Sequence, residues 1–165
     1  MTRIEQLLAE SFAMESQANV RYLASAIRAD REGQGQAARL FRATAAAAAI
    51  HAHNYLLALG PIQSTEKNLL EAIAHETRDV EQIYPEMITI AKTEGHRSGE
   101  ATSIHTNEVK KFHVQLYQKL LNELGKSQET FSYHVCPICG YTAENEPPLT
   151  CPVCGAKGES FKRID

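Results

Sequence analysis

The chain has 165 residues, of which 43% are hydrophobic and 22% are charged, and its formal net charge at pH 7 is −3. The slightly acidic balance and the lack of a basic run speak against nucleic-acid binding, and no apolar run approaches the ~18–20 residues that a membrane span needs. The N-terminal MTRIEQLLAE has no signal-peptide core, so we expect a cytoplasmic protein.

Four long segments have the three- and four-residue apolar spacing of amphipathic helices. They cover about residues 4–33, 36–59, 67–90 and 98–125. Gly60 and Pro61 are expected to end the second helix, Ser64 or Thr65 to cap the third, and Pro85 to kink it. Four helices of this length with short connections predict an all-α four-helix bundle.

All four cysteines lie in the last 30 residues, as two C-x-x-C pairs separated by eleven residues. The ligands in this pattern are Cys136, Cys139, Cys151 and Cys154. Two such pairs can offer four thiolates to one tetrahedral ion, and about 30 residues are too few for a stable core without a metal. We therefore predict a metal-binding cysteine module. Iron and zinc both suit it, and a disulfide pair or free thiols are the alternatives.

Two acids and two histidines are centred on the apolar faces of four different helices. They are Glu15, His51, Glu76 and His113, and Asp79 lies one turn beyond Glu76. An unpaired ion in a dry core costs several kcal/mol, so these acids need cations or protons as partners. A single residue of this kind would be interpreted as an ordinary interfacial or hydrogen-bonded side chain. The joint pattern indicates a metal site, because inward-facing carboxylates and Glu-x-x-His pairs are how a bundle holds two irons.

Five separated segments resemble the rubrerythrin family in order and spacing, and the resemblance covers essentially the whole chain. They are FAMESQANVRY, HAHNY, NLLEAIAHET with IYPEM, KFHVQLY, and a rubredoxin-like C-P-x-C-G-Y followed by C-P-x-C-G. The resemblance implies a ferritin-like four-helix bundle over residues 1–127 and a rubredoxin-like iron module over residues 132–165. It also implies reduction of hydrogen peroxide at a di-iron site, with electrons from a reduced-nicotinamide-dependent partner protein entering through the rubredoxin-type iron. Zinc is the expected substitute for iron in the cysteine module.

Position by position, the resemblance also assigns roles within the bundle. The terminal ligands would be Glu15 with His51 for one iron, and Glu76 with His113 for the other. Asp79 falls where the family has a glutamate that exchanges with the histidine as the redox state changes. Tyr22 and Tyr84 match tyrosines that hydrogen-bond the carboxylates, and we take them as the catalytic candidates.

Two positions depart from the family pattern, which has a bridging glutamate on the second helix and another on the fourth. The corresponding residues are Ala48 and Lys110, and Glu108 cannot substitute because it points to another helix face. A lysine ammonium ~4 Å from an iron would be repelled by several kcal/mol at an effective dielectric of about 20. We predict a weakened, singly occupied or empty bundle site. The alternative to a peroxidase is an inert bundle with an electron-transfer or structural metal module. Iron storage is a weaker third hypothesis, because nothing in the sequence suggests assembly into a cage.

The connection between the second and third helices predicts a homodimer. Residues 60–66 reach at most about 25 Å, whereas a ferritin-like bundle needs this connection to run roughly 30 Å or more. We expect two chains to exchange helices, so that each metal site is assembled from both. The cysteine module is expected to dock near the bundle of the partner chain.

Overall fold

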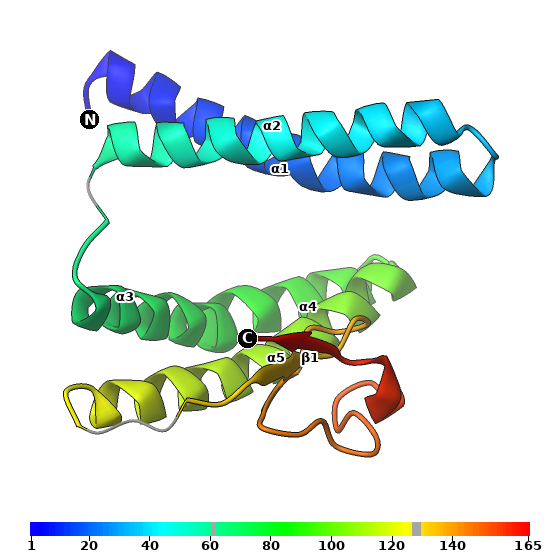
Figure 1. Cartoon of the computed structure of the whole chain (residues 1–165). Coiled ribbons are helices and arrows are strands. Elements are labelled where there is room, and N and C mark those ends of the chain that lie inside the picture. The colour runs from blue at the N-terminus through cyan, green and yellow to red at the C-terminus, as the bar shows by residue number, and fades with distance from the viewer. Residues whose placement is uncertain (61, 127–129) are drawn as a thin grey trace. The chain divides into compact units, whose positions relative to one another are not determined.

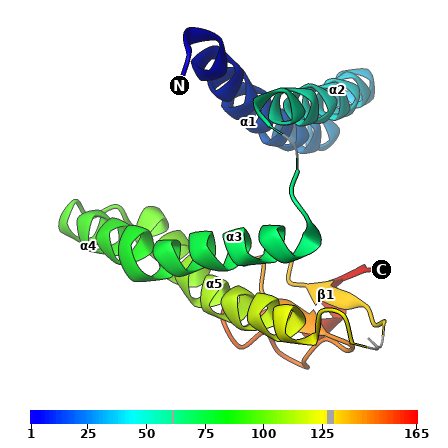
Figure 2. The same cartoon turned by 90° about the vertical axis from the view of Figure 1, so that its left-hand side faces the viewer.

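The computed structural model describes residues 1–60, 62–126 and 130–165, so the predicted helix stop at Pro61 lies outside the described residues. Two compact units make up the chain, residues 1–62 and residues 63–165, and each is described by itself (Figures 1 and 2). In the part of the chain that the structure describes, no helix has the length and apolar character needed to span a membrane.

The first unit is a hairpin of α1 (Arg3–Arg31) and α2 (Gly35–Leu59). Thr2 begins α1 with a capping box, in which its hydroxyl and the Glu5 carboxylate each accept a backbone N–H of the other residue. Small side chains line the shared face and let the helices pack closely. The buried ones are Ala26, Ala29, Ala38, Ala45, Ala48 and Ala52. Asn19 adds a cross-helix hydrogen bond of 2.8 Å from its Nδ2 to the Ala45 carbonyl.

Several large apolar or aromatic side chains of this hairpin are exposed within the unit. Ile4 is 61% exposed, Leu40 63% and Tyr22 37%. These side chains are exposed because two helices bury only the strip that they share. The alanines occupy that strip, and the larger apolar side chains lie outside it.

The second unit begins with α3 (Thr65–Arg78), a π-helical turn η1 (Asp79–Ile83) and α4 (Tyr84–Thr93), which pack against α5 (Arg97–Glu123). The predicted third helix therefore runs from Thr65 to Thr93 and contains a π-helical turn just before Pro85. Proline has no N–H and its ring clashes with the carbonyl four residues earlier in a regular helix. The wider turn, in which the Tyr84 N–H donates to the Asp79 carbonyl, accommodates it. Such turns are frequent at functional sites, and this one contains Asp79.

The cysteine module completes the second unit with a small antiparallel sheet. Its strands are β1 (Tyr133–Val135), β2 (Thr142–Glu144) and β3 (Lys162–Ile164), in the order β2-β1-β3, with a 3-10 turn η2 (Gly158–Ser160) before β3. Gly158 is buried, and any side chain there would collide with the Pro148 carbonyl. The close approach of these two backbone segments therefore requires glycine.

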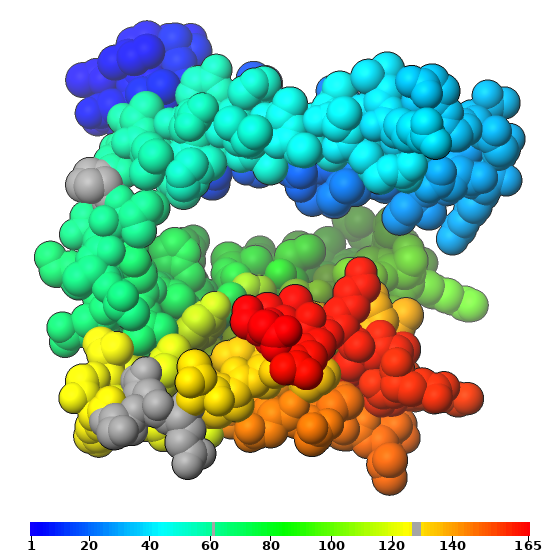
Figure 3. Space-filling model, in the orientation of Figure 1, coloured from blue at the N-terminus to red at the C-terminus, as the bar shows by residue number. Residues whose placement is uncertain are grey.

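The module docks on α5 of its own chain. Lys119 Nζ donates to Glu144 Oε2 at 2.7 Å, and the rings of Phe112 and Tyr141 meet edge to face with centroids 4.9 Å apart. In the space-filling view the module, coloured from gold to red, lies beside the yellow-green and yellow part of α5 (Figure 3). This docking brings β2 beside the helix that carries His113.

Candidate metal centres

Two matching turns bring the four cysteines together. Cys136 N–H donates to the Tyr141 carbonyl at 2.8 Å, and Cys151 N–H donates to the Ala156 carbonyl at 2.7 Å. Each turn contains a glycine with positive φ, Gly140 at 84° and Gly155 at 76°. Only glycine adopts this conformation at little cost, so the two C-x-x-C-G sequences dictate two equivalent loops.

The four sulfur atoms lie within 4.8 Å of one another. Cys136 and Cys154 have their sulfurs 3.6 Å apart, as do Cys139 and Cys151. A disulfide bond would need about 2.0 Å, and all four cysteines are free. Metal–sulfur bonds of about 2.3 Å in a tetrahedron place the sulfurs about 3.8 Å apart. The donor set therefore fits one tetrahedral iron or zinc ion.

The thiols also show why a cation is needed here. Burial raises the pKa of the Cys136 thiol, but backbone N–H groups of Cys139 and Ile138 and the Cys154 thiol outweigh it and lower that pKa to about 7. Burial raises the pKa of Cys139 and of Cys154 above the ordinary value. A thiolate on one of these cysteines disfavours ionisation of the neighbouring thiols, and a bound cation offsets this repulsion between negative charges.

In the helical part of the second unit, Lys110 holds the two predicted acidic ligands. Its Nζ lies 2.8 Å from Glu76 Oε1 and 3.0 Å from Asp79 Oδ2, and the lysine side chain is only 19% exposed. Burial works against the charged amine, yet hydrogen bonds to Glu76 and Asp79 outweigh it and raise the pKa of Lys110 above 10.5. An ammonium ion thus lies between two carboxylates that the sequence predicts as iron ligands.

The raised pKa of Lys110 predicts an alkaline loss of stability. The Lys110 ammonium stabilises the folded state fully below 10.5, its pKa in the unfolded chain. This stabilisation is lost as the pH rises through the higher pKa of the folded state. We expect the free energy of unfolding to fall above about pH 10.5 more steeply in the wild type than in Lys110→Met. Denaturant titrations from pH 8 to 11.5 measure this. Lys111→Met, which removes an exposed lysine paired with Glu108, is the control, and identical slopes for all three proteins would contradict the expectation.

One oxygen in this cluster has no hydrogen-bond partner among the residues that the structure describes. Glu76 Oε2 is buried without a hydrogen bond and lies 3.7 Å from His113 Nδ1, too far for a hydrogen bond. His113 Nε2 lies 3.2 Å from the Thr142 hydroxyl of the cysteine module. Glu76 Oε2 and His113 Nδ1 thus face each other, and both atoms are able to bind a cation. Lys110 binds the other Glu76 oxygen.

The first unit places the other predicted pair together. Glu15 Oε2 lies 3.5 Å from His51 Nδ1, on facing positions of α1 and α2. The His51 side chain is 56% exposed, so the predicted burial of this histidine is not found in the unit. Ala48, one turn before it, is 3% exposed and packs in the alanine strip. Nothing at position 48 can contribute a ligand atom.

The two tyrosines predicted as catalytic candidates belong to different units. The Tyr22 ring lies near Phe41, with centroids 6.3 Å apart, and Tyr84 begins α4 half-buried. Among residues 1–60, 62–126 and 130–165, the four cysteines are the one group of three or more His, Cys, Asp or Glu donors within metal-binding distance of one another. Within each unit, the donors present do not form a di-iron site, and the predicted roles of these residues stay predictions.

Comparison with known proteins agrees with both parts of this description. The family model described as "Rubrerythrin" matches residues 6–121, and that described as "Rubrerythrin, rubredoxin-like domain" matches residues 134–162. The chain belongs to the rubrerythrin family. Both matches lie inside the predicted domains 1–127 and 132–165, although the boundary itself stays a prediction because residues 127–129 lie outside the described part.

Several rubrerythrins are similar over most of their length. Rubrerythrin-2 of Clostridium acetobutylicum is 28% identical, with 94% of this chain and 93% of the relative covered. Rubrerythrin of Porphyromonas gingivalis is 30% identical over 90% of this chain and 84% of its own. Among solved structures, partially reduced nigerythrin superposes with a TM-score of 0.61 at 26% identity, covering 99% of this chain and 88% of that one. The chain is therefore a rubrerythrin-family non-haem iron protein, as the sequence predicts.

Some contacts of this rubrerythrin could not be found by sequence reasoning. Thr142 contacts His113 across 29 positions in the chain, and no spacing rule links a strand residue to a distant helix. Asn107, one turn before Lys110, is 9% exposed and its Oδ1 has no partner among the described residues. The sequence around a polar helix residue does not indicate whether that residue is buried without a hydrogen-bond partner.

Proposed function

We propose that this rubrerythrin carries single electrons on an iron held by the cysteine module, and that its di-iron site is impaired by Lys110 and Ala48. When bound by four thiolates, iron changes between its ferric and ferrous states with little rearrangement of its ligands. The observation that carries the proposal is the position of Lys110 Nζ, 2.8 Å and 3.0 Å from two acids expected to hold iron. Metal ions and this ammonium compete for the same oxygen atoms.

A charge count supports the impairment. The retained acids Glu15, Glu76 and Asp79 carry −3 in total, and Lys110 reduces this to −2, whereas two ferrous ions carry +4. The family pattern sets five carboxylates against these ions. At about 4 Å and an effective dielectric of about 20, each unit of metal charge would be repelled by the ammonium by about 4 kcal/mol.

Iron is favoured over zinc in the cysteine module by the resemblance to rubredoxin and by the family. One nigerythrin structure similar to this chain is described as fully reduced and all ferrous. Zinc remains the alternative ion, because both metals accept tetrahedral sulfur. The four unpaired thiols are suited to a reducing compartment, and we propose the cytoplasm, with a reduced-nicotinamide-dependent protein as electron donor.

Peroxide reduction is the second candidate function. It is favoured by the two carboxylate–histidine pairs that the chain keeps, Glu15 with His51 at 3.5 Å and Glu76 with His113 at 3.7 Å. In this case hydrogen peroxide would be the substrate and the cysteine-bound iron would return the electrons. The two functions share the cysteine module and differ in whether the bundle reacts.

Anaerobic reaction of the fully reduced protein with hydrogen peroxide separates these functions. The visible absorption of the ferric cysteine site reports its oxidation. The first proposal predicts that oxidation is slow and no faster than in the variant His113→Gln, which keeps a polar side chain of similar size. Fast oxidation in the wild type that His113→Gln abolishes would contradict it and establish the peroxidase.

We also propose that two chains form a helix-exchanged homodimer. The helices leave only residues 60–64 between α2 and α3, and five residues bridge about 20 Å at most. A connection along the 25-residue α2 would need to cover about 37 Å. A ferritin-like bundle requires one such long connection, so the α1–α2 hairpin of one chain would pack on the α3–α5 helices of the other. The exposed Leu23, Ile27 and Ile50 of the hairpin supply apolar surface for this packing.

Lengthening the connection tests the exchange directly. Insertion of 20 Gly/Ser residues after Gly60 gives a chain long enough to close the bundle on itself. We expect the wild type to be a dimer in light scattering and the insertion variant to become largely monomeric at the same concentration and helix content. A monomeric wild type would exclude the dimer, and a dimeric insertion variant would exclude the exchange.

A further inference from the structure

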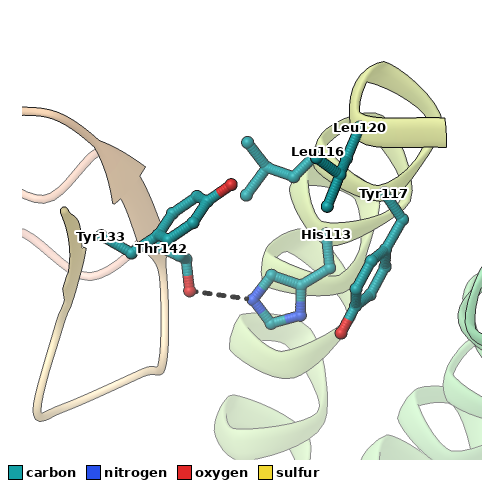
Figure 4. Close-up of a pocket in the computed structure, with 6 residues that line it drawn as sticks. All are labelled: His113, Leu116, Tyr117, Leu120, Tyr133 and Thr142. Carbon is teal, nitrogen blue, oxygen red and sulfur yellow. Dashed lines mark hydrogen bonds between the residues drawn. The ribbon is translucent and has the colours of Figure 1, made fainter. Parts of the chain in front are cut away.

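His113 has neighbours on both sides, and each ring nitrogen has a different one. Nε2 faces Thr142 Oγ1 at 3.2 Å, and Nδ1 faces Glu76 Oε2 at 3.7 Å. Figure 4 shows the imidazole of α5 pointing its Nε2 at the threonine hydroxyl of β2. The two residues line a cavity of about 300 Å³ between α5 and the cysteine module.

The hydrogens available to this chain of contacts can be counted. A threonine hydroxyl has one hydrogen to donate and can accept others. Thr142 Oγ1 donates to the Gly140 carbonyl at 3.2 Å. The remaining contact, to His113 Nε2, is then a hydrogen bond only if the nitrogen carries the hydrogen and the threonine oxygen accepts it.

The opposite tautomer satisfies fewer groups. With its hydrogen on Nδ1, His113 would aim it at Glu76 Oε2, but 3.7 Å is beyond hydrogen-bond distance. Thr142 would then have to donate to Nε2 and abandon the Gly140 carbonyl. The arrangement with Nε2–H keeps two hydrogen bonds and leaves the Nδ1 lone pair facing the unpartnered Glu76 Oε2.

We propose that Thr142 is a positioning residue of the cysteine module that holds His113 as the Nε2–H tautomer, with Nδ1 directed at Glu76 Oε2. Two acceptor atoms that face each other across such a gap form a place for a cation. A histidine that binds a metal donates its other ring N–H to an orienting group, and here the orienting group comes from a different module of the chain.

A dependence between the two metal centres follows. Thr142 lies three residues after Cys139, and Gly140, two residues before it, lies in the first cysteine turn. A module of about 30 residues needs its metal to stay folded, so losing that metal releases Thr142 from His113. Occupancy of the cysteine module therefore prepares the bundle histidine to bind a cation. This inference rests on the proposed function only in taking His113 as a metal ligand.

Nuclear magnetic resonance of the histidine nitrogens tests the tautomer without any catalytic readout. The protein is labelled with ¹⁵N-histidine and loaded with zinc in the cysteine module, which keeps it diamagnetic, and His113→Gln assigns the signal. We expect a hydrogen on Nε2 alone in the wild type and in Thr142→Ser. Thr142→Val, which keeps the shape but lacks the hydroxyl, is expected to show exchange between both tautomers. Thr106→Val is the matched control and should resemble the wild type, because the Thr106 hydroxyl donates to the Thr102 carbonyl of its own helix.

A hydrogen on Nδ1, or on both nitrogens, in the wild type would overturn the proposal before any variant is made. An unchanged Nε2–H signal in Thr142→Val would overturn the role of the threonine. Removing zinc with a chelator should produce the spectrum of Thr142→Val, and an unchanged His113 signal would overturn the dependence on the module.

Cobalt binding provides the second readout. In a Lys110→Met background, which removes the competing ammonium, Co²⁺ is titrated into protein with a zinc-loaded module. Adding Thr142→Val is expected to weaken cobalt binding in the bundle 10- to 100-fold, the usual effect of removing an orienting partner, and equal affinities would contradict the positioning role. A correct tautomer together with a full iron pair in the wild type would refute the proposed function and leave this inference standing.

Discussion

Replacing both Ala48 and Lys110 with glutamate is expected to raise the iron content of the protein from about one to about three per chain. The double change removes an ammonium that holds Glu76 and Asp79 and supplies the two carboxylates that the family pattern places there. Removing a repulsion of about 4 kcal/mol per unit of metal charge corresponds to roughly 1000-fold or more in affinity. Peroxide-driven oxidation of the reduced protein is expected to become fast in the same variant.

The double variant Ala48→Gln with Lys110→Gln is the matched control. It removes the ammonium and adds side chains of the same size, but it supplies no negative charge. We expect it to gain little iron and no fast reaction with peroxide. Position 48 is buried in the hairpin, so without metal the glutamate variant should also be less stable than the glutamine variant. If the glutamate variant holds iron only in the cysteine module, our explanation of the defect is wrong.

Replacing Cys136 with serine is expected to remove the iron of the cysteine module and to unfold that module. Cys136 is 1% exposed and its sulfur lies 3.6 Å from that of Cys154. Structural metal sites of this kind contribute on the order of 10 kcal/mol to folding, more than a short sheet can replace. The helices should persist, because α1 to α5 do not depend on thiolate ligands.

Visible absorption, metal analysis and circular dichroism together measure this outcome. Ile138→Ala, which changes an exposed residue between two ligands that is 70% accessible, is the control and should keep its iron. A Cys136→Ser protein with a full complement of iron would show that Cys136 is not a required ligand, and a sheet that stays folded after metal loss would show that the module does not need its metal.

The features that sequence alone predicts here are local ones. The helices follow from apolar spacing and from caps such as Ser64, whose side chain accepts the Lys67 N–H as predicted. The cysteine centre follows from two C-x-x-C-G turns. Each turn is formed by six consecutive residues and depends on the conformation of a single glycine. Such features need no knowledge of which surfaces meet.

The features that sequence could not predict depend on docking. Lys110 is visibly anomalous in the family pattern, but its two carboxylate partners come from α3 and η1. Thr142 has no unusual sequence context, and only the packing of β2 on α5 gives it a role. The exposure of Tyr22 and His51 follows from the alanine strip between α1 and α2, where periodicity alone suggested a larger buried face.

The number of iron and zinc ions per chain, measured on anaerobically purified wild-type protein, tests the central claim most directly. One metal ion per chain, with the absorption of a ferric ion held by four cysteines, is the predicted result. It would mean that the cysteine module is loaded and that Lys110 takes the place of metal in the bundle. Three irons per chain would contradict the account, because the bundle would then hold a full pair despite the ammonium and the missing carboxylates.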